Sequence, residues 1–268
     1  MGLLDWLRPA APTPSPAPAT HALAMVLLES SAVADAAAIL AHVRAHAPDL
    51  PPLTDVETSD AGVTTAKIPG GVVGLIRLPV PVPRGDLEGP VALAWHWPEA
   101  EETVARHGAH VIVHAASDTL DPLALRLLHT RLVAAVAATA RALGVYVGEA
   151  LLVRAAADYV EDAREASAEN PPLLSWVGFN LVGEPDDRFS AYTTGLERLG
   201  MPELEVRRVA QPAPEVIGLL ADVAHYQLTT GKRLEDGDTF GASATDRRRV
   251  RHARSSFIPK TPVMLLEA

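Results

Sequence analysis

Histidines crowd one short stretch of the sequence, and imidazole is both a common metal ligand and a proton carrier near neutral pH. His107, His110 and His114 follow one another closely, with His96 nearby. On a helix, His110 and His114 would converge on one ion, but "HVIVH" is β-branched and alternating, which is typical of a strand. On a strand these two residues lie about 13 Å apart. The sequence therefore predicts structural or surface histidines and no metal site.

A second set combines carboxylates with hydroxyl groups. Tyr192, Thr193, Glu203, Glu205 and Asp238 would do acid and base work if a cleft raised the pKa of one carboxyl group. Alternation along "PELEV" puts both glutamates on one strand face, about 7 Å apart. We expect them to form a solvated or partner-facing acidic edge rather than a catalytic pair.

The stretch "LEDGDTFG", residues 234–241, brings three carboxylates together as a calcium loop does. An EF-hand needs the pattern D-x-[DN]-x-[DN]-G and a glutamate at the twelfth position. Here a glycine already follows Asp236 at the second place, and residues 242–249 supply no glutamate. We expect a turn at Asp236-Gly237, in which Asp238 or Thr239 bonds local backbone amides.

The basic run "DRRRVRHAR", residues 246–254, stands out in an acidic chain. From His225 onward Lys and Arg exceed Asp and Glu by three, whereas the rest of the chain carries a net charge of -13. Arg248 and Arg251 are candidates for binding phosphate or an acidic partner, since guanidinium groups pair with both. The run would equally complement the acidic first region of the same molecule.

Sequence signatures of common catalytic machinery are missing. The chain has no G-x-S-x-G, no G-x-x-x-x-G-K-[ST] and no H-E-x-x-H, and it has no cysteine. Disulfides, thiolate zinc sites and thiol nucleophiles are thereby excluded. The sequence predicts no catalytic residue and no cofactor. Trp95 and Trp97 flank His96 on an expected strand, where they form either an aromatic wall for a ligand or part of the core.

Composition limits the class of protein. The chain has 268 residues, of which 48% are hydrophobic, and a formal net charge of -10. This charge argues against general nucleic-acid binding, so we expect a protein or a small molecule as partner. The apolar run at residues 132–147 contains Arg141 and is too short to span a membrane. With a poor signal-peptide pattern at the N-terminus, the expected compartment is the cytoplasm.

The N-terminal residues 1–20 differ from the rest. Leu3, Leu4, Trp6 and Leu7 give residues 1–8 an apolar face that would dock weakly on a partner or a membrane surface. The proline-rich stretch that follows predicts a tether of about 35 Å. We expect this whole segment to be disordered.

Residues 21–169 predict an α+β region. Hydrophobic periodicity and turn residues indicate a strand at "ALAMVLLES", a helix at "AVADAAAILAHVRAHAPD", a hairpin at Gly70-Gly71, a strand at "VALAWHW", a helix at "PEAEETVARHG" and a strand at "AHVIVHA". They continue with a helix from Pro122 to Leu143 that ends at Gly144, a strand at "VYVGEALLV" and a helix at "AADYVEDAREASA".

A second α+β region is expected over residues 170–268, after the boundary at Asn170-Pro171-Pro172. It predicts a strand at "SWVGFNLV", a turn at "DDRFSAYTTG", a short helical turn closed by Gly200, a strand at "PELEVRRV", a helix closed by Gly231 and a strand at "PVMLLEA". The fold class is therefore α+β, with mainly antiparallel sheets, packed helices and two α/β subdomains.

The ordered set "WVGFNLV", "YTTGLERLGMPELEV", helix and "LEDGDTFG" resembles the bacterial domain-of-unknown-function family 4261, mainly over residues 176–266. The order of elements around "WHW…HGAHVIVHA" looks like the upstream part of such proteins. The resemblance implies a bacterial protein without an assigned substrate. "YTTGL" and "PELEV" are also similar to suppressor-of-fused-like domains of bacterial immunity proteins, which implies a module that blocks a partner.

Together these patterns favour a non-catalytic protein-binding module with an immunity-like or regulatory role. An enzyme built on the Tyr, Thr and carboxylate cluster, and a phosphate or nucleic-acid contact through the arginine run, stay open as alternatives. The candidate binding residues are Tyr192, Thr193, Thr194, Gly195, Glu203, Glu205, Asp236, Gly237, Asp238, Thr239, Arg248 and Arg251.

Overall fold

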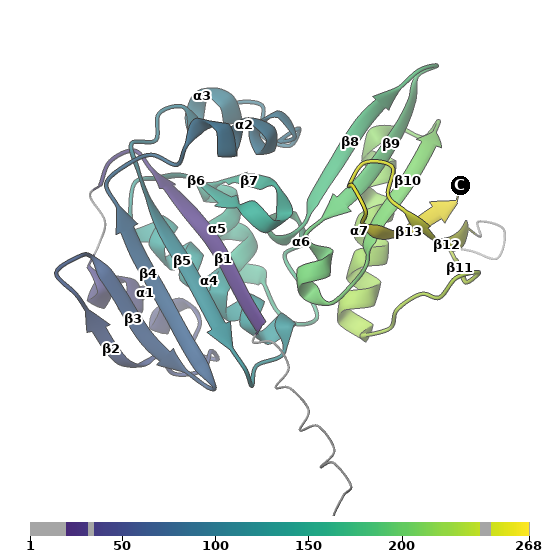
Figure 1. Cartoon of the computed structure of the whole chain (residues 1–268). Coiled ribbons are helices and arrows are strands. Elements are labelled where there is room, and N and C mark those ends of the chain that lie inside the picture. The colour runs from purple at the N-terminus through teal and green to yellow at the C-terminus, as the bar shows by residue number, and fades with distance from the viewer. Residues whose placement is uncertain (1–19, 32–34, 242–247, 268) are drawn as a thin grey trace, which may run out of the picture.

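The computed structural model describes residues 20–31, 35–241 and 248–267. The predictions made for residues 1–19 lie outside these ranges. Two sheets, each with helices packed against it, make up the described part of the chain (Figure 1). Neighbouring strands run antiparallel except for the β10–β13 pair, so the predicted α+β class is confirmed.

The first sheet has seven strands in the order β2-β3-β4-β5-β1-β6-β7. Within it, β1, α1, β4, β5, α4 and β6 follow the split βαβ arrangement. The helix α4 connects β5 to β6, with β1 between them, and α1 leads through β2 and β3 to β4, which β5 separates from β1. The strands are β1 (Thr20–Leu28), β2 (Thr54–Thr58), β3 (Val63–Ile68), β4 (Gly71–Leu78), β5 (Ala109–Ser117), β6 (Ala142–Val147) and β7 (Leu152–Ala155).

Helices cover both faces of the first sheet. One face packs against α1 (Ala36–His46), α4 (Pro122–Thr139) and α5 (Ala156–Glu165) in the largest hydrophobic core. The other face carries α2 (Arg84–Ala92) and α3 (Ala100–Val104), which form a smaller core with Leu27, Tyr146 and Val153.

The second sheet has the order β11-β12-β13-β10-β9-β8 and packs one face against α7 (Ala213–Thr230). Leu204 and Val206 of β10 are fully buried in this core, as the alternation of "PELEV" predicts. The strands are β8 (Gly178–Glu184), β9 (Arg188–Thr194), β10 (Glu203–Val209), β11 (Thr239–Phe240), β12 (Arg248–Arg254) and β13 (Pro262–Glu267).

One expected strand is wrong. "VALAWHW" contributes the end of α2 and the turn that leads to α3, so Trp95 and Trp97 do not share a strand face. Trp97 is buried and its ring lies against Gly144, where an added Cβ would come within 2.9 Å of it. Trp95 stays 46% exposed. The hydrophobic side chain of Trp97 is therefore buried by packing against the sheet and not by strand pairing.

Three further boundaries differ from expectation. The long helix ends at Thr139 rather than near Gly144, which lies inside β6. "VYVGEALLV" forms two strands joined by a 3-10 turn, η2 (Gly148–Ala150), since Leu151 adopts a left-handed φ of 49°. "DDRFSAYTTG" is a turn only at Asp186 and Asp187, whose φ angles are positive, and then becomes β9.

The start of the expected strand "SWVGFNLV" is also corrected, because Ser175 and Trp176 end the short helix α6 (Leu173–Trp176). The remaining elements are confirmed to within a few residues. These include the hairpin at Gly70-Gly71, the turn η3 (Leu196–Leu199) closed by Gly200 and the helix closed by Gly231.

The two sheets meet where η2 packs on the ends of β8 and β9. Thr194 Oγ1 donates a hydrogen bond to the Ala150 carbonyl at 2.5 Å. A Cβ at Gly178 would lie 2.4 Å from the same carbonyl oxygen. A Cβ at Gly195, whose φ is 103°, would lie 2.9 Å from both Ala150 Cβ and the Trp176 carbonyl oxygen. The seam between the sheets therefore requires glycine at both positions.

A matched pair of glycine substitutions tests this seam. Gly195→Ala should lower the free energy of unfolding by roughly 1–3 kcal/mol, because it adds a clash and a strained φ. Gly218→Ala, within α7 and with open space around its Cβ, should raise it by about 0.5–1 kcal/mol. Urea denaturation of the two variants measures both changes, and equal effects would contradict the close contact.

Candidate functional site

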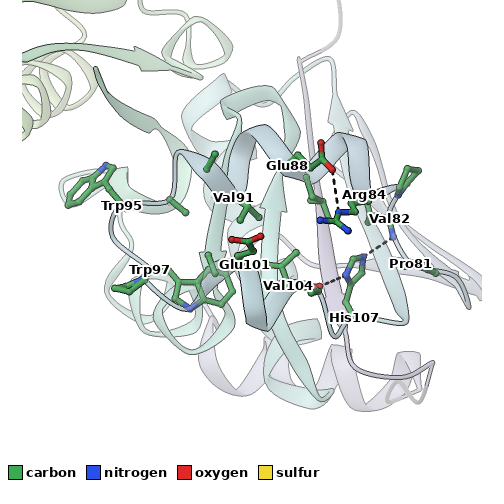
Figure 2. A pocket seen from close by; sticks show the side chains of 17 residues that line it. Pro81, Val82, Arg84, Glu88, Val91, Trp95, Trp97, Glu101, Val104 and His107 are labelled. Atoms are coloured by element: carbon green, nitrogen blue, oxygen red, sulfur yellow. Dashed lines mark hydrogen bonds and ion pairs between the residues drawn. The ribbon is translucent and has the colours of Figure 1, made fainter. Parts of the chain in front are cut away.

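A groove between α2 and α3 has a volume of about 740 Å³ (Figure 2). Its lining is mainly apolar, and both tryptophans of the α2–α3 turn stand at one end. Cavities of this size are typical of ligand sites. The residues that line the groove include Leu87, Val91, Trp95, Trp97, Val104 and His107.

Two polar side chains of the groove, His107 and Arg84, have partners within the protein. His107 Nε2 accepts a hydrogen bond from the Val82 amide at 2.9 Å, and its Nδ1 contacts the Val104 carbonyl at 2.5 Å. At the rim, Arg84 Nε lies 3.3 Å from Glu88 Oε1. With both ring nitrogens engaged, His107 fixes the wall of the groove and leaves neither nitrogen available to act as a base.

The groove meets the second sheet through Trp95. Its indole Nε1 donates a hydrogen bond to the Phe179 carbonyl at 2.8 Å, although about half of the side chain is exposed. A side chain from the α2–α3 turn thus reaches β8, and the exposed part of its ring joins the groove to that strand.

Glu203 closes the turn that follows β9. Its Oε2 accepts a hydrogen bond from Thr193 Oγ1 at 2.7 Å, and its Oε1 accepts from the amides of Gly195 and Glu197 at 2.9 and 3.1 Å. The side chain is 5% exposed. Burial raises the pKa of this carboxyl group, while the hydrogen bonds from Glu197, Thr193 and Gly195 act in the opposite direction.

Glu205 is fully buried and holds a different loop. It accepts hydrogen bonds from Arg207, from Ser255 Oγ at 2.6 Å and from the Ser256 amide at 3.2 Å. The expectation of a solvated or partner-facing acidic edge is therefore wrong for both glutamates. They share a strand face as predicted, but loops cover that face and supply the donors that buried carboxylates need.

The other predicted residues near β9 also have partners inside the protein. Tyr192 stacks on Phe257 with ring centroids 5.1 Å apart, and Thr194 bonds Ala150 in the seam. Asp238 lies beside β11, and β12 and β13 separate β11 from β10. At about 4.8 Å per strand, Asp238 is roughly 14 Å from the glutamates. The five residues of the enzymatic alternative do not converge on one point.

The stretch at residues 236–239 forms the predicted turn, with Gly237 at a φ of 90°. Asp238 Oδ2 accepts from the Glu235 amide at 2.8 Å, as expected, while Asp236 Oδ1 accepts from the His252 amide at 2.7 Å. Thr239 pairs with β12.

Arg248 and Arg251 both lie on β12. Arg251 Nη1 bonds Glu267 Oε1 on the neighbouring strand at 3.1 Å, so this basic group is paired within the second sheet rather than with the first region. A binding role for these two arginines stays a prediction.

The predicted family motif occupies most of the second sheet. Residues 192–267 match the family model described as a domain of unknown function, DUF4261. The resemblance expected from the sequence is thereby confirmed for this segment. The groove, α2, α3 and β8 lie outside the DUF4261 segment. No curated protein and no solved structure matched the chain.

An ion-pair cluster that no sequence pattern indicated joins the DUF4261 segment to the first sheet. Glu149 of η2 lies 3.5 Å from His21 Nε2, 3.8 Å from Arg126 Nη1 and 4.0 Å from Arg198 Nε. Arg126 is 4% exposed, and nearby His129 is fully buried. Burial of His129 and the neighbouring Arg126 charge lower the pKa of His129 to about 3. His129 is therefore neutral, and the cluster fixes η2 by charge.

Within residues 20–31, 35–241 and 248–267, no group of three or more His, Cys, Asp or Glu side chains is arranged to hold a metal ion. The helices of the same ranges are all too short or too polar to cross a bilayer.

The buried Glu203 carboxyl group makes stability depend on pH. Because its folded pKa lies above the ordinary 4.5, the folded chain binds this proton more tightly than the unfolded chain does. Ionisation of Glu203 therefore lowers the free energy of unfolding. The wild-type protein loses this stability as the pH rises from about 4.5 through the raised pKa of the folded state. Glu203→Gln, which cannot ionise, should become more stable relative to wild type between pH 5 and pH 8.

Urea denaturation at both pH values gives the comparison. The control is Glu215→Gln, at an exposed position in the first turn of α7, which removes one charge without a buried carboxyl group. If both variants follow the same pH dependence, burial does not set the proton affinity of Glu203.

Proposed function

We propose that this protein is a protein-binding module of the bacterial cytoplasm, and that the groove between α2 and α3 binds an apolar segment of its partner. The placement in the cytoplasm rests on the cysteine-free sequence, which fits a reducing compartment. The bacterial origin rests on the DUF4261 resemblance.

The groove is the observation that carries this proposal. It offers about 740 Å³ lined mainly by apolar side chains, and a large aromatic ring, Trp95, stays half exposed at its end. Exposed aromatic and aliphatic groups around a concave site are typical of binding surfaces, because they supply apolar area that a partner removes from water. The one histidine in the lining already has both nitrogens engaged, which favours binding over acid and base chemistry.

The charge around the groove indicates which kind of partner segment it would bind. Between residues 84 and 106, α2, α3 and their connection carry five acidic side chains and two basic ones. Glu88 and Glu101 stand on the lining itself, where Arg84 faces Glu88. A segment with apolar side chains flanked by Lys or Arg complements this rim.

Peptide selection tests the proposal without knowledge of the natural partner. A phage-displayed library of random 12-residue peptides is panned against the immobilised full chain. The expected result is a set of peptides rich in apolar residues with flanking Lys or Arg. Their affinity should fall at least about tenfold for Val91→Glu, which puts a charge on the groove lining.

The matched control is Val72→Glu, at an exposed valine of β4 that is not part of the groove lining. It should leave peptide affinity unchanged, and circular dichroism checks that both variants fold. Failure to enrich any sequence, or equal affinity for the two variants, would contradict binding in the groove.

A further inference from the structure

The two sheets have four outer edges among the described residues, and three of them are protected. β2 is charged and irregular, with a register shift between Thr54 and Glu57 and a positive φ at Asp55. β11 has two residues, and β7 has four, of which the first three are buried. Short, charged or bulged edges are the usual defences against pairing with another chain.

The edge formed by β8 is longer and regular, and the one charged residue of the strand is Glu184 at its end. It has seven residues, contains neither proline nor lysine, and pairs with β9 in one regular register from Gly178 to Glu184. Among the described residues, no other strand pairs with β8. Its second half, from Leu181 onward, is partly exposed, and an added Cβ at Gly183 would have nothing within 4 Å.

The hydrogen bond of Trp95 shows in which direction the backbone N–H and C=O groups of β8 point. Its indole bonds the Phe179 carbonyl, so Phe179 points its N–H and C=O away from β9. Alternation gives the same outward direction to Leu181 and Gly183. β8 is an outer strand of the second sheet (Figure 1). Within the part of the chain that the structure describes, Leu181 and Gly183 therefore direct their N–H and C=O groups to a side where no strand pairs with them, next to the Phe179 carbonyl that Trp95 bonds.

We propose that an extended segment of the partner protein pairs with the outer edge of β8 at Leu181–Glu184, as an added strand, and continues past Trp95 into the groove. The inference rests on the proposed function and specifies its binding mode. Another extended backbone is the ligand that complements alternating N–H and C=O groups. Trp95 touches both surfaces, so one continuous chain reaches the edge and the groove.

Charge favours a basic partner segment over a second copy of this chain. The end of β8 and the turn that follows it carry Glu184, Asp186 and Asp187, and Arg208 lies 3.6 and 4.0 Å from the first two. Acidic groups also dominate the groove rim. Pairing of two β8 strands would bring both sets of carboxylates together, which is unfavourable, whereas Lys or Arg in a partner segment complements them.

Substitutions at Gly183 test the added strand with the peptides enriched from the library. Gly183→Pro removes the outward N–H, and an edge strand tolerates proline where that N–H faces solvent. Gly183→Ala keeps the N–H and its methyl group has room. We expect Gly183→Pro to weaken peptide binding at least about tenfold and Gly183→Ala to leave it unchanged. Equal affinity for both variants overturns the added strand.

The groove variant separates this inference from the proposed function. If Val91→Glu abolishes peptide binding while Gly183→Pro does not, the added strand is wrong and the groove proposal stands. If neither substitution matters, both are wrong. Loss of binding in both variants, with Gly183→Ala normal, supports one continuous site.

Amide hydrogen exchange of the wild-type chain gives a second readout that does not depend on how Gly183→Pro folds. The amides of Leu181 and Gly183 should exchange quickly in the free protein, and the Val182 amide, which points to β9, slowly. Saturation with an enriched peptide should slow the first two. Unchanged exchange at both overturns the added strand.

Discussion

The arrangement of the two sheets depends on one close backbone contact, that of the η2 turn with the glycines that flank β8 and β9. Gly178 and Gly195 leave room for Ala150, and Thr194 bonds the Ala150 carbonyl across the contact. Beneath it the Trp176 indole donates to Thr130 Oγ1 on α4 at 2.7 Å. Since these groups are buried and paired, the seam fixes the position of β8 relative to the first sheet. Trp95 reaches Phe179 only because of that position.

Two buried carboxylates organise the DUF4261 segment in the same way. Glu203 satisfies the amides of the turn after β9, and Glu205 satisfies the loop at Ser255 and Ser256. Burying a charge is costly unless donors surround it, and here backbone and hydroxyl groups supply them. Residues that mark this segment in the sequence, Glu203 and Glu205, therefore hold loops in place.

Local periodicity predicted most of the strands and helices but not what covers them. The alternation of "PELEV" placed Leu204 on the core side and both glutamates opposite, as observed, yet it gave no sign that Ser255, some 50 residues later, covers Glu205. The "VALAWHW" pattern misled because Trp97 packs against Gly144, a distant contact that local alternation cannot reveal. The groove was missed for the same reason, since its walls come from two short helices whose packing on the sheet is tertiary.

The position of β13 has a consequence for how the chain folds as it leaves the ribosome. β13 lies between β10 and β12, so β11 and β12 join the sheet only through it. β10 ends at Val209 and β13 begins at Pro262, and translation at about 5–20 residues per second needs roughly 3–10 s for the interval. Until β13 is available, β10 has no partner strand on that side, and the apolar core lacks Met264 and Leu266. Chaperone binding during synthesis would protect this intermediate more than any state of the finished protein.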